Sequence, residues 1–318
     1  MNPNRRIFLK NSAIATSGII LAPWLLESCD SPSGNQSESS PKEMFFKISL
    51  AEWSLHKALF AGKITNMDFP ALAKNEFGVD GIEYVNQFFK DKAKDTGYLT
   101  ELKTRADDLG LKTLLIMIDG EGSLGAPEES ERRSAVENHY KWVEAAKFLG
   151  CHSIRVNAHG EGTAEEVHAG AVQGLSSLAT FAQDYGLNVI VENHGGYSSD
   201  GSWLTSVMAE INMENCGTLP DFGNFCLKRT DDGCAEEYDR YKGVTEMMKF
   251  AKAVSAKTND FDASGNETHT DYKRMMQIVK DAGYRGFVGI EYEGRDLDEY
   301  EGIRASKALL EKVGAELS

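Results

Sequence analysis

The chain has few basic residues and lacks several motifs that mark common classes of enzyme. Lysine and arginine number 34 against 49 acidic residues, which gives a formal net charge of -15 over 318 residues. No basic stripe stands out, which argues against a nucleic-acid-binding surface. There is no P-loop, no G-x-S-x-G and no H-E-x-x-H, so we do not expect the phosphate-binding, serine-hydrolase or zinc-protease sites that these motifs mark.

Cysteine is also scarce, with five residues in the chain. The four beyond the N-terminal segment lack the paired short spacing of a zinc ribbon. Cys151 and Cys216 open expected strands and are interpreted as small buried hydrophobes. Cys226 and Cys234 flank an expected loop, where they form a disulfide if the compartment is oxidising and stay free thiols otherwise. We attach no catalytic role to this pair.

No confident membrane span is found, because the apolar stretch 13–26 is short and interrupted. A twin arginine at 5–6 precedes it, and residues 26–29 read Leu-Glu-Ser-Cys. This end resembles a bacterial lipoprotein cleavage box, in which Glu27 is a poor match. We therefore expect an exported protein that is periplasmic, or lipid-anchored to the bacterial envelope through Cys29. An ordinary cleaved signal with an incidental cysteine is the alternative.

The chain divides by composition into three parts. Residues 1–29 form the expected twin-arginine signal segment. Residues 30–43 are rich in Ser, Pro and Gly and cannot bury a core, so a disordered linker is predicted there. Residues 44–318 are long enough for one large α/β domain.

One pattern recurs through residues 44–318: a helical segment ends in glycine and an apolar strand follows at once. A glycine after a helix adopts the left-handed conformation that caps it. The five cases are Gly78, Gly110, Gly150, Gly186 and Gly283. Three more strands are expected at 46–53, 217–222 and 253–257. Eight strands alternating with helices predict a single (β/α)8 TIM barrel, with a doubly wound open sheet as the competing fold.

Two long helical segments support this alternation. They cover residues 128–149 and 164–185. The second carries a one-sided apolar stripe made of Val167, Ala171, Leu175, Leu178 and Ala182. Such a stripe is typical of a helix that packs on a sheet.

Acids stand at the ends of several predicted strands, among them Glu192, Asp221 and Glu291. Strand ends of a barrel gather at one rim, where several carboxylates repel one another unless a cation or protons neutralise them. Oxygen ligands suit Mg²⁺ or Mn²⁺, and a histidine in the set would admit Zn²⁺ or Co²⁺. Any one acid can be a solvated loop residue, but that explanation is weak for the whole set.

Four motifs carry a resemblance to a known family. They read Val-Glu-Asn-His at 191–194, Leu-Pro-Asp-Phe-Gly-Asn at 219–224, Ser-Ala-Lys at 255–257 and Gly-Ile-Glu-Tyr-Glu at 289–293. Through them the chain resembles the xylose isomerase-like TIM-barrel superfamily, which includes ketose 3-epimerases, inosose dehydratases, hydroxypyruvate isomerases and endonuclease IV. The resemblance implies one divalent metal ion, held by Glu192, Asp221 and Glu291.

The family's fourth ligand, a histidine of strand seven, is absent here. Ser255 stands in its place, and serine is a feeble ligand for these metals. Water or another side chain completes the shell, with His194 the nearest candidate, or else metal binding is weakened or lost. Asn224 stands where relatives often have histidine, so substrate contacts are expected to differ there.

The resemblance also implies the chemistry. Glu192 and Glu291 would stand on opposite faces of the substrate and exchange protons next to a carbonyl, with His194 as a further acid or base. Lys257 would donate to the developing oxyanion, with a lowered pKa if it is desolvated. A salt bridge of Lys257 to Asp260 or Asp262 at the rim is the alternative.

Other strand-end residues are candidates for substrate contacts. Those assigned to substrate binding are Trp53, Arg155, His159, Asn224 and Glu293. Trp53 would form an apolar wall with Phe88 and Phe89, or simply pack. His159 and His194 would orient hydroxyls, or else serve as structural histidines. Glu83 is expected to bond loop backbone instead of substrate.

A G-x-G-x-x-G match at 120–125 follows a strand, but Ala126, Pro127 and a run of acids come next, so dinucleotide binding is not favoured.

We therefore predict a metal-dependent sugar isomerase or epimerase whose partner is a small sugar or keto-sugar. A lyase or dehydratase on keto-sugars or keto-inositols would use the same proton abstraction. A non-catalytic exported sugar-binding protein would fit the loss of the strand-seven histidine. Charge and export signal disfavour DNA repair of the endonuclease IV type. The sequence leaves the oligomeric state open.

Overall fold

The computed structural model describes residues 43–231 and 233–318. The expected signal segment with Cys29, and all but the last residue of the expected linker, lie outside these residues. Within them, no helix combines the length and the apolar character that crossing a bilayer requires.

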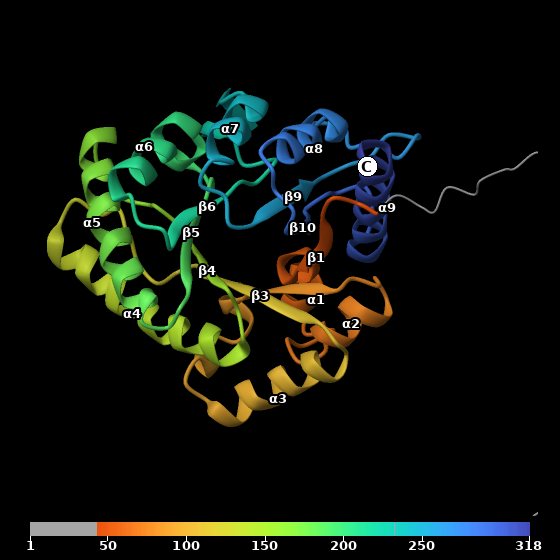
Figure 1. The fold of residues 1–318 in the computed structure, drawn as a ribbon, viewed down its shortest axis with the longest axis horizontal. Coiled ribbons are helices and arrows are strands. Elements are labelled where there is room, and N and C mark those ends of the chain that lie inside the picture. Colours follow the sequence, from red (N-terminus) through yellow and green to blue (C-terminus); the bar gives the residue numbers. More distant parts are fainter. Residues whose placement is uncertain (1–42, 232) are drawn as a thin grey trace, which may run out of the picture. The chain divides into compact units, whose positions relative to one another are not determined.

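Eight parallel strands form one sheet (Figure 1). They are β1 (Lys47–Ala51), β2 (Gly81–Val85), β3 (Lys112–Met117), β4 (Ser153–Val156), β5 (Asn188–Glu192), β6 (Cys216–Leu219), β9 (Val254–Thr258) and β10 (Phe287–Tyr292). The first strand pairs with β2 on one side and with the last strand, β10, on the other. Parallel bridges from Thr218 to Ala251 and from Asp221 to Ser255 connect the outer edges. The predicted barrel is confirmed, because a doubly wound open sheet would not pair its first strand with its last.

Helices follow the strands and pack outside them. They are α1 (His56–Phe60), α2 (Phe69–Asn75), α3 (Thr96–Asp108), α4 (Glu129–Leu149), α5 (Ala164–Gln183), α6 (Gly201–Ile211), α7 (Arg240–Met247), α8 (Tyr272–Asp281) and α9 (Glu299–Leu317). Short 3-10 turns are η1 (Glu52–Leu55), η2 (Asn86–Phe88), η3 (Lys90–Lys92) and η4 (Gly196–Ser199). The predicted stripe of α5 is buried throughout. All five predicted capping glycines have positive φ, between 61° and 85°.

The barrel interior combines apolar and polar side chains. Every second residue of a strand points inward. The apolar inward residues include Ala51, Val85, Leu115, Met117, Ile190 and Leu219. The polar ones in the same alternation are at most 4 % exposed: Ser49, Glu83, Ser153, Arg155, Glu192, Ser255, Lys257 and Glu291. Burying this many polar groups costs free energy unless they bond to one another or to a ligand.

One element was not predicted. After β6, where a plain loop was expected, β7 (Cys226–Thr230) and β8 (Gly233–Glu237) form an antiparallel hairpin. A disulfide joins Cys226 and Cys234, a pairing that the sequence left open. Cys151 and Cys216 are buried and free, as predicted.

Candidate active site

Three predicted carboxylates converge where the barrel strands end. Glu192 ends β5, Asp221 follows β6 and Glu291 lies near the end of β10. One oxygen from each lies within 4.8 Å of the others, and all three side chains are buried. Strand polarity explains this convergence, since parallel strands deliver their last inward residues to the same rim. The group could hold a metal ion.

Arg155 lies between two of the acids at this rim. Its Nε is 2.8 Å from Glu192 Oε2, an ion pair without hydrogen-bond alignment. Its Nη1 donates to Asp119 Oδ1 at 2.8 Å. Asn224 Nδ2 donates to the other oxygen of Glu192 at 2.9 Å. Both oxygens of Glu192 therefore have a partner from this chain.

Lys257 forms the second cationic centre. Its Nζ donates to Glu291 Oε1 at 2.7 Å and to Glu293 Oε1 at 2.8 Å, and lies 4.0 Å from Asp221 Oδ2. Burial acts to lower the pKa of Lys257, but Glu291, Asp221 and Glu293 outweigh it and hold the pKa well above its ordinary value. The expectation of a lowered pKa is wrong, because desolvation occurs beside three carboxylates.

The alternative expected for Lys257, a rim salt bridge, is not formed either. Asp260 accepts from the backbone of Arg295 and Asp296, and Asp262 accepts from its own loop. The ammonium group instead belongs to the buried rim.

Ser255 links the carboxylates instead of leaving a gap at the missing histidine. Its Oγ donates to Asp221 Oδ2 at 2.6 Å and lies 3.1 Å from Glu291 Oε2. His194, the expected substitute ligand, is not part of the three-carboxylate group that the described residues form.

Negative charge exceeds positive charge in this cluster. Two cations, Arg155 and Lys257, face five carboxylates, those of Asp119, Glu192, Asp221, Glu291 and Glu293. Burial raises the pKa of Glu192 to about 7 against the pull of Arg155, and raises that of Asp221 to about 7 against the pull of Lys257. Protons or a divalent cation can balance such an excess. The buried oxygen donors therefore fit a hard divalent cation.

Asp119 differs from these acids. Burial acts to raise its pKa, but Arg155 and Asn157 outweigh burial and hold the pKa below its usual range. Burial lowers the pKa of His194, with Arg155 adding to the effect. The surroundings thus favour the ionised form of Asp119 and the neutral form of His194.

A cavity of about 440 Å³ opens above the carboxylates. Its walls include Trp53, Asp119, Arg155, Asn157, His159, His194, Glu291 and Glu293. Among the described residues, Asn157 Oδ1 and His194 Nδ1 are buried without a hydrogen-bond partner. Unpartnered polar atoms in a cavity wall suit a ligand that carries hydroxyl groups. Of the predicted substrate contacts, Asn224 does not line this cavity and instead holds Glu192.

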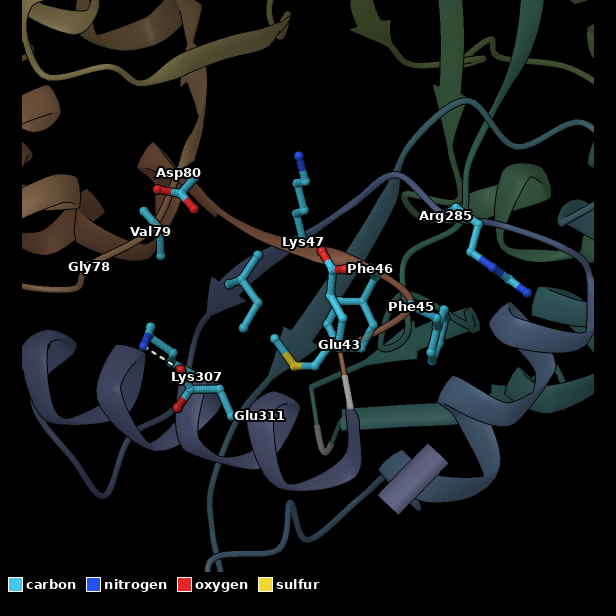
Figure 2. A pocket seen from close by; sticks show the side chains of 12 residues that line it. Glu43, Phe45, Phe46, Lys47, Gly78, Val79, Asp80, Arg285, Lys307 and Glu311 are labelled. Atoms are coloured by element: carbon cyan, nitrogen blue, oxygen red, sulfur yellow. Dashed lines mark hydrogen bonds and ion pairs between the residues drawn. The ribbon is translucent and has the colours of Figure 1, made fainter. Parts of the chain in front are cut away.

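A larger cavity, about 570 Å³, lies elsewhere. Its walls include Lys47, Asp80 and Arg285, near the starts of strands β1, β2 and β10 (Figure 2). None of the predicted site residues reaches it. Volume alone therefore does not locate the chemistry, since barrel active sites lie at the opposite ends of the strands.

Of the three aromatic residues expected to form a wall, Trp53 lines the cavity, and Phe88 and Phe89 are not among its lining residues. Trp53 stacks on Phe88 at 6.0 Å between ring centroids, and Phe60, which is 61 % exposed, meets both rings. Phe89 instead packs in the core against Trp142. Phe60 lies at the end of the short helix α1 and has no motif around it, so its place in this cluster was not predicted.

Two strand-end acids do not reach the cavity. Glu52 accepts hydrogen bonds from Asn66 Nδ2 at 2.7 Å and from the amide of Val85 at 3.0 Å. Glu83 accepts from Ser49 Oγ at 2.6 Å, deep in the barrel, so the expected bond to loop backbone is wrong. Burial raises the pKa of Glu52 to about 8 and that of Glu83 to about 7.

Known proteins support the fold. A family model described as Xylose isomerase-like TIM barrel matches residues 71–313. D-psicose 3-epimerase, solved in the presence of D-fructose, has a TM-score of 0.64 at 13% identity, over 85% of this chain and 100% of that chain. The 3-keto-D-glucoside 4-epimerase from E. coli has a TM-score of 0.63 at 16% identity, over 85% and 100%.

A xylose isomerase-like TIM barrel protein from Mycobacterium smegmatis, in complex with magnesium, has a TM-score of 0.62 at 14% identity, over 85% of this chain and 95% of that chain. No curated protein matches the sequence. At such identities the likeness to solved structures demonstrates a common fold.

Proposed function

Since the chain belongs to the xylose isomerase-like TIM barrel family, we propose that it is a divalent-metal-dependent sugar isomerase or epimerase. The main support is the buried group of Glu192, Asp221 and Glu291. One oxygen of each carboxylate lies within 4.8 Å of the others, beside a polar cavity. Its substrate is a small polyhydroxy compound with a carbonyl, next to which the enzyme removes a proton.

Glu192, Asp221 and Glu291 would hold the metal ion. When bound, the ion polarises the substrate carbonyl and stabilises the negative charge that forms there. The solved relative from Mycobacterium smegmatis contains magnesium, which agrees with an oxygen-rich ligand set. Mn²⁺, Zn²⁺ and Co²⁺ remain alternatives to Mg²⁺ for this chain.

Glu291 is the residue proposed to meet the substrate first, because it lines the cavity whereas Glu192 does not. Glu192 is proposed as the acid–base partner on the other face, which requires it to exchange its contact with Arg155 for the substrate. Lys257 stays charged because of its raised pKa. It therefore acts as a hydrogen-bond donor to the developing oxyanion instead of as a base.

The cavity walls would orient the sugar. His194 and Asn157 line the cavity, and each keeps one buried polar atom without a partner. His159 and Trp53 belong to the same lining, where Trp53 would contact the apolar side of the ring. Asp119 and Glu293 are placed to accept from hydroxyl groups.

One observation favours a second candidate, an exported sugar-binding protein without catalysis. Ser255 and Lys257 already engage the oxygens that a metal ion would take. If these contacts persist in solution, the carboxylates are satisfied within the chain and no cation enters.

Metal content separates the two candidates. The protein would be purified folded without added metal and assayed by plasma mass spectrometry beside Glu192→Gln and Asp221→Asn. About one equivalent of metal that disappears in both variants supports the enzyme. Solvent deuterium would then be followed into keto-sugars, and an absorbing enone product would identify the lyase in place of the isomerase. Absence of metal in every sample, even after titration with metal ions, would contradict the proposed enzymatic function.

We also propose that the protein is exported and tethered through a lipid on Cys29. The support is the twin arginine at 5–6 and the Leu-Glu-Ser-Cys sequence at 26–29. Labelling with radioactive palmitate in a bacterial host should mark the wild-type chain and not Cys29→Ser. An unlabelled chain released to the periplasm would indicate an ordinary cleaved signal.

A further inference from the structure

A second cavity adjoins the candidate active site. It has a volume of about 540 Å³, within the range of roughly 300–1,000 Å³ usual for ligand pockets. His159 lines both this cavity and the one above the carboxylates, so the two are neighbours with one residue in common. Its walls come from the loop after β4, the start of α5, η4, the start of α6 and the hairpin strand β7. We refer to it as the outer cavity.

Two aromatic rings form one wall of the outer cavity. Tyr197 and Trp203 stack with centroids 5.8 Å apart and planes 30° apart. The Tyr197 hydroxyl donates to Gly162 O at 2.9 Å, and the Trp203 indole donates to Ala164 O at 3.2 Å. Because the polar atoms of both rings are tied to backbone, the rings are held in place. Tyr197 nevertheless remains 37 % exposed. A fixed and accessible aromatic face suits stacking against the apolar face of a sugar ring.

The remaining walls combine apolar packing with one carboxylate. Ala158 and Val167 are buried, and Leu227 is half-buried. Within the described residues, the hydrogen bonds of Asp200 all use Oδ1, which accepts from Ser202 and Trp203. Its second oxygen can accept from a ligand hydroxyl. An apolar cavity with one charged acceptor is poorly suited to a phosphate and well suited to a neutral polyhydroxy ring.

The hairpin gives this cavity a wall that the barrel itself does not supply. Leu227 follows Cys226, which is bonded to Cys234, and β7 lies against η4, which carries Tyr197. The disulfide thus restrains the segment that brings Leu227 into the lining of the same cavity as the aromatic rings. The hairpin is otherwise exposed and adds little to the core.

We propose that the outer cavity binds a second sugar ring, so that the substrate is a glycoside of at least two rings. Its reacting ring lies over Glu291, and its second ring lies between Leu227 and the Tyr197 face. This inference rests on the proposed function for the position of the reacting ring. It goes beyond that function because it assigns the substrate class.

The test compares one-ring and two-ring ligands of the same chemistry. The probes are methyl 3-keto-β-D-glucoside and the 3-keto forms of cellobiose and maltose. Binding is measured by calorimetry in the wild-type protein and in the Glu291→Gln variant, in which turnover does not interfere. At least one disaccharide should bind about tenfold more tightly than the methyl glycoside, a difference of about 1.4 kcal/mol.

Substitutions in the outer cavity should remove only this preference. Tyr197→Ala and Leu227→Arg should bring the disaccharide close to the methyl glycoside and leave the methyl glycoside unchanged, whereas Tyr197→Phe should retain the preference. Phe148→Ala is the matched control, because Phe148 is an aromatic residue of similar exposure, 40 %, on α4. Circular dichroism would verify that each variant folds.

The outcomes are distinct from those for the proposed function. If the protein prefers the disaccharide through Tyr197 but has neither metal nor turnover, the second-ring site is supported and the proposed enzymatic function is contradicted. If the protein turns over a monosaccharide and shows no preference for a disaccharide, the proposed enzymatic function is supported and the second-ring site is contradicted. Equal binding of all three probes, or binding of none, also overturns it.

Discussion

The acids buried in and beside the barrel fall into two groups with different surroundings. On the side of β5, β6 and β10, Glu192, Asp221 and Glu291 lie beside the cations Arg155 and Lys257. On the side of β1 and β2, the hydrogen bonds that Glu52 and Glu83 accept within the described residues come from neutral donors, which are Asn66, the Val85 amide and Ser49. Only the first group reaches the cavity, through Glu291.

Burial alone raises a carboxyl pKa on either side, and the value for Glu52, about 8, is above those for Glu192 and Asp221. A raised pKa therefore does not identify a catalytic residue in this barrel. Cationic partners and, for Glu291, access to the cavity distinguish the acids of the proposed site from Glu52 and Glu83.

The largest expected difference between the two sides is in activity. Glu291→Gln should lower the exchange of a substrate proton with solvent deuterium by about 10²- to 10⁴-fold, because an acid–base group that faces the cavity is lost. Glu83→Gln, with the same chemical change, should lower it less than about tenfold. Mass spectrometry of recovered keto-sugar measures both rates. An equal loss of exchange in the two variants would contradict the expected difference in role between Glu291 and Glu83.

The cations should matter more for stability than the neutral donors. Lys257→Met leaves Glu291 and Glu293 without their cation and should lower the free energy of unfolding by about 3–5 kcal/mol. Ser49→Ala removes one neutral hydrogen bond to Glu83 and should cost about 1 kcal/mol. Urea unfolding with a chelator present measures both. Similar costs for the two substitutions would contradict the expected role of charge.

Glu52 should make stability depend on pH. Because its pKa is raised to about 8 in the folded state, the folded protein keeps a proton that the unfolded chain loses above about pH 4.3. Its contribution is complete below that pH and is lost as the pH rises towards 8. Glu52→Gln removes this loss. Between pH 5 and pH 8, the free energy of unfolding of the variant should therefore rise relative to that of the wild type by an amount on the order of 3 kcal/mol.

Urea unfolding at several pH values tests this prediction. Glu131→Gln, on the exposed face of α4, controls for the removal of one negative charge. A constant difference between Glu52→Gln and the wild type at every pH would mean that Glu52 is ionised in the folded protein.

The last prediction concerns Ser255, which contacts both Asp221 and Glu291. Ser255→His places an imidazole between Asp221 and Glu291 and should tighten Zn²⁺ or Co²⁺ binding by about tenfold, or about 1.4 kcal/mol. Ser255→Ala controls for loss of the hydroxyl. Competition with a chromogenic chelator measures the affinity. No gain for the histidine variant relative to alanine would show that Lys257 blocks the fourth position.

Much of the fold could be predicted because its signals are local. Capping glycines such as Gly150 mark where helices end, and the stripe of α5 marks the face it buries. Parallel strands bring their ends together without further information, so the convergence of Glu192, Asp221 and Glu291 could be predicted as well. The hairpin escaped notice because its residues are exposed and carry no apolar alternation.

What the sequence determined by itself is the order of strands and helices, the class of barrel and the acids of its rim, since each depends on neighbours along the chain. Only the tertiary structure decided which of those acids contact Arg155 or Lys257 and that Lys257 keeps its charge. It also decided that Phe89 packs in the core and that His159 lines two cavities. The physical reason is that charge interactions and packing add up through space over residues far apart in the chain. A local sequence pattern does not contain these interactions between distant residues.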